Sequence, residues 1–163
     1  MSNQENNNTL ESGLDETRNF FNMPIFDEVL KMFNEVGADS VKVHPGISEK
    51  EAQDQNRIFE ERFGVGLPAG YLLLLQKANG IKMFDKVVFD VHGIMEKQTK
   101  AVGDNGKLRY IFIGSDITVH FAYDLLSGKY AVLGTRENET IAESESLAEL
   151  IINIFDLAQY LSF

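Results

Sequence analysis

The stretch 58-IFEERFGVGLPAGYLLLLQKANG-80 decides how the chain folds. Its charged first part ends at Gly64 and Gly66, and glycine commonly stops a helix. Leu67-Pro68 then begins a second helix, because proline suits the first helical turn. The apolar run Tyr71–Leu75 wraps most of that helix, which predicts a deeply buried element. We expect Asn79-Gly80 to end the helix with a left-handed cap.

Two further elements are predicted before this stretch. Residues 23–36 carry an apolar stripe at helical spacing, which predicts a helix that stops at Gly37. Residues 41–43 favour a short extended segment. Ser48 and Glu51 form the capping box typical of a helix start, so the charged helix is expected from residue 48 to the glycines.

After Gly80 the apolar pattern changes to period two, which is typical of strands. We expect strands at residues 81–84, 87–91, 108–113, 117–123 and 129–133, an edge strand at 140–142 and a loop at 97–107. Ser127-Gly128 favours a hairpin turn, and Ser146 with Glu149 forms another capping box before a helix that runs to Leu161.

The order of these elements predicts an α+β fold. We expect a single domain over residues 23–163, with a mostly antiparallel central sheet packed with N-terminal helices and one C-terminal helix. Residues 1–22 are acidic and polar with few apolar side chains. Such a segment cannot bury enough apolar surface to offset its ordering entropy, so we expect a flexible tail.

Composition excludes several kinds of chemistry. The 163 residues contain no Cys, which excludes thiolate catalysis, disulfides and cysteine-based metal sites. The longest apolar run, Tyr71–Leu75, is far shorter than the ~20 residues that span a bilayer. The first residues lack a signal-peptide pattern, so we expect a cytoplasmic location and no membrane contact. The formal net charge of -10 repels a phosphate backbone, so direct nucleic-acid binding is not expected.

The acidity is concentrated near the carboxyl end. Residues 137–163 contain acidic side chains but no Lys or Arg. One interpretation is solubility and helix-end electrostatics, and the other is an acidic face for a basic partner. Loops and charged rims carry specificity more often than core strands. The predicted partner contacts are therefore Ser115, Asp116, Glu137, Glu139, Glu143 and Glu145.

Catalytic and metal-binding patterns are missing from the sequence. His44, His92 and His120 lie far apart and lack the helical spacing of metal ligands. We interpret them as surface or hydrogen-bonded structural residues, with a zinc site assembled by folding as the alternative. The aromatic residues of the strands at 108–113 and 117–123 are interpreted as core, because no basic stripe lies beside them in sequence. We therefore expect no catalytic residue, no metal and no cofactor.

Residues 58–71 and the sequence that follows resemble the SUKH superfamily, also called Smi/Knr-like domains. The signature residues follow in the order typical of that family, and 112-FIGSD-116 and 121-FAYD-124 are similar to its central strand pair. The segment 141-IAES-144 with the final helix is similar to its closing element. The resemblance spans about residues 40 to 163. The matched residues, interpreted as fold determinants rather than contacts, are Leu67, Pro68, Tyr71, Asn79 and Gly80.

What the resemblance implies is binding rather than catalysis. Bacterial SUKH proteins are regarded as immunity proteins that neutralise partner toxins, often nucleases or nucleic-acid deaminases, encoded beside them. A fungal relative is a scaffold and regulator of cell-wall synthesis. The leading hypothesis is an immunity protein that blocks a cognate toxin domain. The alternatives are a scaffold or regulatory protein-binding module without a toxin partner, and an enzyme that uses one of the histidines.

Overall fold

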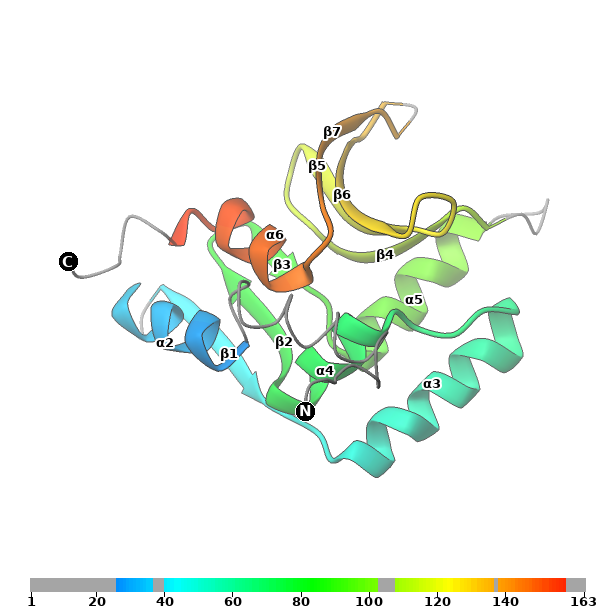
Figure 1. Ribbon diagram of the computed structural model, residues 1–163, viewed down its shortest axis with the longest axis horizontal. Helices are drawn as coiled ribbons and strands as arrows, with labels where there is room; N and C mark the ends of the chain where they lie inside the picture. Colours follow the sequence, from blue (N-terminus) through cyan, green and yellow to red (C-terminus); the bar gives the residue numbers. More distant parts are fainter. Residues whose placement is uncertain (1–25, 37–39, 103–107, 137, 158–163) are drawn as a thin grey trace, which may run out of the picture.

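The computed structural model describes residues 26–36, 40–102, 108–136 and 138–157. Within these residues the strands form one antiparallel seven-stranded sheet in sequence order (Figure 1). The strands are β1 (Val41–Pro45), β2 (Ala78–Met83), β3 (Lys86–Val88), β4 (Tyr110–Ser115), β5 (Val119–Asp124), β6 (Lys129–Gly134) and β7 (Thr140–Ser144). The helices are α2 (Phe26–Val36), α3 (Glu49–Phe63), α4 (Ala69–Lys77), α5 (Val91–Val102) and α6 (Leu147–Ile154). The predicted α+β fold is confirmed, and the predicted tail, residues 1–22, lies outside the described residues.

Helix α3 begins at the predicted capping box. The Ser48 hydroxyl accepts a hydrogen bond from the Glu51 N–H at 3.1 Å, and the Glu51 carboxylate accepts one from the Ser48 N–H at 3.1 Å. Gly64 ends the helix with a φ of 82°, the left-handed conformation that favours glycine. The second predicted box, before α6, is half formed. The Ser146 hydroxyl accepts from the Glu149 N–H, but the Glu149 carboxylate accepts from the Ser144 hydroxyl.

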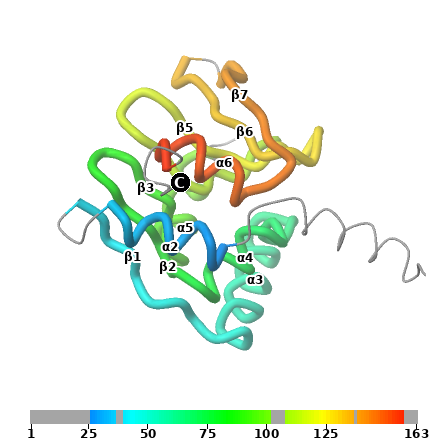
Figure 2. Tube along the Cα trace, turned by 60° about the vertical axis from the view of Figure 1, so that its left-hand side comes forward, coloured from blue at the N-terminus to red at the C-terminus, as the bar shows by residue number. Residues whose placement is uncertain are grey.

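The main core lies between one face of the sheet and the helices α2, α4 and α6. Helices α2 and α6 lie next to each other over this face (Figure 2). Phe33 of α2 and Phe155, directly after α6, meet edge to face with their ring centroids 5.1 Å apart. Tyr71 of α4 is fully buried among them, as predicted. Helix α4 is less enclosed than predicted, because 46% of Leu73 is exposed.

The predicted cap at Asn79-Gly80 is wrong. Helix α4 ends at Lys77, and the backbone of Ala78 is already extended and opens β2. Gly80 has a φ of +100° inside that strand, where it packs against Asp90. The left-handed conformation was therefore predicted correctly but assigned to the wrong element. Because α4 passes directly into β2, no turn residues lie between them, and the sequence contains no turn signal that would locate the end of the helix.

The predicted loop at 97–107 is also wrong, because α5 occupies its first residues and 103–107 lie outside the described part of the chain. Asp90 begins the helix, since its carboxylate accepts a hydrogen bond from the Gly93 N–H at 2.7 Å. Gly93 lies in the first turn of α5, and glycine is more typical of loops than of helices. Val91 is therefore the first residue of a helix and not the end of a strand. Similarly, β5 begins at Val119 rather than at residue 117.

Strands β4 to β7 curve strongly together (Figure 1). The strand pairing is irregular between Phe112 and Gly114 and again between Val132 and Leu133, and such bulges increase the bend of a sheet. On the face opposite the main core, this curved part carries a second, smaller apolar cluster. Its members are Phe112, Ala122, Ala131 and Leu133, with Tyr110 packed against them.

Candidate functional site

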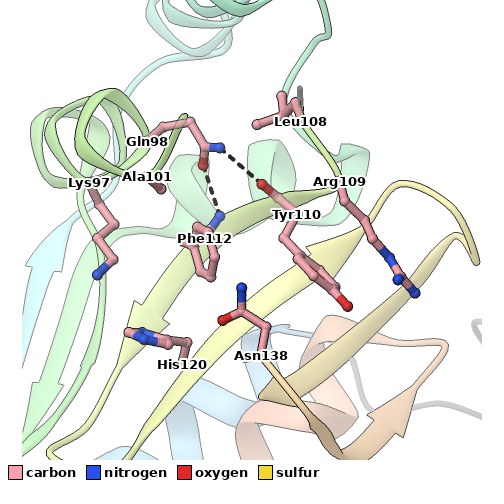
Figure 3. Close-up of a pocket in the computed structure, with 9 residues that line it drawn as sticks. All are labelled: Lys97, Gln98, Ala101, Leu108, Arg109, Tyr110, Phe112, His120 and Asn138. Atoms are coloured by element: carbon pink, nitrogen blue, oxygen red, sulfur yellow. Dashed lines mark hydrogen bonds between the residues drawn. The ribbon is translucent and has the colours of Figure 1, made fainter. Parts of the chain in front are cut away.

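A pocket of about 380 Å³ opens beside this second cluster (Figure 3). Its walls come from α5, from β4 and the residues just before it, from β5, and from the connection between β6 and β7. The lining residues are Lys97, Gln98, Ala101, Leu108, Arg109, Tyr110, Phe112, His120 and Asn138. The volume falls in the range of roughly 300–1,000 Å³ typical of small-molecule sites.

Gln98 holds α5 at the edge of β4. Its side chain is fully buried, donates a hydrogen bond to the Tyr110 carbonyl at 2.9 Å and accepts one from the Phe112 N–H at 3.0 Å. Strand β3 pairs with β4 only near Gly114 and Ser115, so this part of the β4 edge lacks a neighbouring strand. The Gln98 amide supplies the hydrogen bonds that a neighbouring strand would otherwise make there. It thereby fixes one wall of the pocket relative to the aromatic side chains.

Two cations border the aromatic side chains of β4. The Lys97 ammonium lies 5.7 Å from the centroid of the Phe112 ring, and the Arg109 guanidinium lies 5.0 Å from that of Tyr110. Arg109 also forms two hydrogen bonds with the buried Asp124, at 3.1 and 3.3 Å. Lys97 forms no ion pair with any described carboxylate.

The Arg109–Asp124 pair shifts the ionisation of both groups. Burial acts to raise the pKa of Asp124, but hydrogen bonds from Arg109 and from the Leu126 N–H outweigh it, and the pKa is lowered. The hydrogen bond to Asp124 raises the pKa of Arg109. The positive charge of Arg109 is therefore balanced within the fold, whereas that of Lys97 is not balanced by a described residue.

His120 contributes an unsatisfied polar atom. Its ring lies 5.4 Å from the Phe112 ring at an angle of 71°. The buried Nδ1 atom has no hydrogen-bond partner among the described residues. Burial lowers the pKa of His120, and the positive charge of Lys97 lowers it further. The imidazole is thus neutral near pH 7, with one nitrogen able to donate and the other able to accept.

The predicted partner contacts that the structure describes are spread over one end of the sheet and along its last strand. Ser115, Asp116 and Glu139 lie at one end of the sheet, because Val119 pairs with Gly134 and the Gly134 N–H donates to the Glu139 carbonyl. Glu143 and Glu145 lie beyond them, along β7 and after its end. Glu137 lies outside the described residues.

The Asp116 carboxylate has a structural role in the turn before β5. It accepts hydrogen bonds from the Thr118 and Val119 N–H groups at 2.7 and 3.0 Å. These bonds hold Ile117 at the tip of the turn, where 76% of the residue is exposed. The predicted strand face at Ile117 is therefore wrong, because the Asp116 turn delays the strand.

The five motif residues of the sequence analysis lie in the core, away from the pocket. The Tyr71 hydroxyl donates to the carbonyls of Phe89 and Asp90 at 2.5 and 3.2 Å, and burial raises its pKa. The Asn79 side chain accepts from the Val91 N–H at 3.0 Å. These contacts join α4, β2 and the start of α5. Leu67 and Pro68 precede α4. Leu67 is buried in the core, and Pro68 occupies the N-cap position without a side-chain cap hydrogen bond.

The three histidines are not brought together. His44 and His92 are exposed in β1 and α5, and three strands separate β1 from the β5 strand that holds His120. Among the described residues no group of three His, Asp or Glu side chains could hold a metal ion. The same residues include no helix that is long and apolar enough to cross a membrane.

Sequence reasoning missed the pocket because α5 was predicted as a loop. Lys97 and Ala101 are four residues apart, so they share a face only once the segment is helical. The alternation of Tyr110 and Phe112 on the neighbouring strand was the other available signal. No protein-family model matches the chain, and no curated protein is significantly similar to it.

Proposed function

We propose that the chain is a cytoplasmic SUKH-type binding domain that neutralises a cognate toxin domain by direct protein–protein contact. The toxin domain is a nuclease or a nucleic-acid deaminase. The observation that carries the proposal is the ordered set of motif residues, of which Tyr71, Asn79 and Gly80 meet at one junction of the core. Tyr71 and Asn79 both bind the backbone between β3 and α5 there. The resemblance therefore rests on residues that build the fold.

The described residues also favour binding over catalysis. His120 has no described hydrogen-bond partner at Nδ1, so no described residue orients the ring through that atom. The Asp116 carboxylate is engaged in its own turn. Neither group is placed as an activated acid or base.

The turn at Ile117 supplies the best contact surface. An exposed apolar side chain lies there beside Asp116, with the exposed Glu139 at the same end of the sheet. Interfaces commonly join a central apolar anchor to a polar rim. Acidic groups around the anchor would steer a basic toxin domain toward this end.

Co-expression with the toxin domain encoded next to the gene tests the proposal. We expect rescue of growth, a one-to-one complex and affinity that falls as salt rises. Ile117→Ala should weaken the complex about tenfold or more if this residue is an interface hot spot. Leu126→Ala is the matched control, because 78% of Leu126 is exposed at the opposite end of β5.

Absence of both rescue and binding would contradict the toxin proposal. Capture of several unrelated housekeeping proteins, with no toxin neutralised, would instead favour a scaffold. A cellular function lost in His44→Ala, His92→Ala or His120→Ala, with the fold intact, would point to an enzyme.

A further inference from the structure

Two polar residues that each have a group without a described partner line the pocket beside α5. His120 Nδ1 is the buried side-chain nitrogen or oxygen without a partner in the described part of the chain. Buried polar groups are normally hydrogen-bonded, and each exception requires an explanation such as strain, a catalytic role, or a bound water or ion. Lys97 lines the same pocket and has no described carboxylate partner. Both groups border one space, with the Asn138 amide beside them (Figure 3).

Charge is distributed in this pocket differently from the rest of the protein. The chain has 25 acidic and 15 basic residues, yet the described residues that line the pocket include Lys97 and Arg109 and no Asp or Glu. Asp124 balances Arg109 from the β5 strand. Among the described residues one positive charge therefore remains uncompensated, at Lys97, and it favours a ligand with a single anionic head group.

The pocket also has apolar walls. Tyr110 and Phe112 lie with their ring centroids 6.2 Å apart, and the Phe112 and His120 rings meet edge to face. Leu108 and Ala101 complete the lining. Aromatic walls of this kind pack against flat apolar groups.

We propose that this pocket binds a small organic anion that joins one anionic oxygen head group to a flat, apolar ring. Lys97 pairs with the head group and the Asn138 amide donates a hydrogen bond to it, while the His120 ring borders the site. The ring packs against Tyr110 and Phe112. This site is distinct from the Ile117 turn and does not depend on the toxin proposal.

Nuclear magnetic resonance of the three histidine rings tests the site in the full-length protein. Benzoate combines the charge and the ring, acetate has the charge alone, and benzamide has the ring alone. We expect benzoate to shift the His120 signals saturably and at lower concentration than acetate or benzamide does. His44 and His92, which lie outside the pocket, serve as internal references and should not move. Phenyl phosphate in place of benzoate shows whether phosphate or carboxylate is the better head group.

Burial lowers the pKa of His120 in the free protein, and the field of Lys97 lowers it further. The bound anion offsets that field and should therefore raise this pKa. The neighbours of His120 across the sheet, Ser115 on β4 and Leu133 on β6, carry no charge. Arg109 also lines the pocket but is paired with Asp124. An upward change in the His120 titration midpoint with benzoate, and none with benzamide, is the expected result.

Lys97→Met removes the charge and keeps an apolar stem over Phe112. It should weaken benzoate binding roughly ten- to a hundredfold, the effect of losing one charge-assisted hydrogen bond. Lys100→Met on the same helix is the control, because Lys100 is exposed outside the pocket. The proposal is overturned by benzamide binding as well as benzoate, by equal shifts at all three histidines, or by Lys100→Met weakening binding as much as Lys97→Met. Any of these results would leave the Ile117 experiment unaffected.

Discussion

Replacement of Gln98 should reveal how much the fold depends on one side-chain amide. Gln98→Met keeps the length and apolar volume of the side chain but removes both hydrogen bonds to β4. The buried Phe112 N–H and the partly buried Tyr110 carbonyl would then lose their partners. An unsatisfied buried polar group costs about 1–3 kcal/mol, and water can reach the second one in part. We expect the free energy of unfolding to fall by about 2–4 kcal/mol.

Gln98→Glu adds a dependence on pH whose sign the geometry fixes. The introduced carboxylate can accept from the Phe112 N–H, but it also faces the Tyr110 carbonyl oxygen. Burial and this repulsion raise its folded-state pKa above the unfolded value of about 4.3. The protonated form can donate to that carbonyl. Destabilisation relative to wild type should therefore be small below about pH 4.3 and grow by up to about 1.4 kcal/mol per pH unit until the folded-state pKa is reached.

Urea denaturation followed by far-ultraviolet circular dichroism measures both effects, at about pH 5 and about pH 8. Gln53→Met and Gln53→Glu are the controls, because Gln53 is exposed on α3. If Gln98→Met were no more destabilising than Gln53→Met, the bridging role of the amide would be refuted. A larger destabilisation by Gln98→Glu at the lower pH would refute the electrostatic argument.

Three further predictions concern the core and the pocket rim. Tyr71→Phe should lower the free energy of unfolding by about 1–3 kcal/mol, because two backbone carbonyls lose the hydroxyl that donates to them. Tyr71→Ala should lower it by about 3–5 kcal/mol. A loss under about 1 kcal/mol for Tyr71→Ala in urea denaturation would contradict the burial of this side chain. Gly114→Ala should lower the free energy of unfolding by about 1–3 kcal/mol, because the added methyl carbon would clash with the Val87 carbonyl oxygen. An unchanged midpoint of thermal unfolding would contradict that close contact. The lowered pKa of Asp124 stabilises the fold at neutral pH, and this contribution is lost as pH falls through the folded-state value. Asp124→Asn should lack that part of the acid dependence, and parallel pH–stability curves for the two proteins would refute the pairing with Arg109.

The sequence alone determined the fold class and most of the elements. The capping box of Ser48 and Glu51 predicts the start of α3, because it depends on two residues only three positions apart. The pair Ser127-Gly128 predicts the turn between β5 and β6, where Gly128 has a φ of 73°. Such signals work because hydrogen bonds and backbone preferences between near neighbours are encoded locally.

Tertiary structure decided the start of β2, the existence of α5 and the pocket. Ala78 leaves the helix because β2 pairs with β1, a contact between residues more than thirty positions apart. Lys97, Arg109 and His120 come together only when α5 docks on the edge of β4 through Gln98. Local patterns cannot specify these positions, because long-range strand pairing and the docking of one buried amide set them.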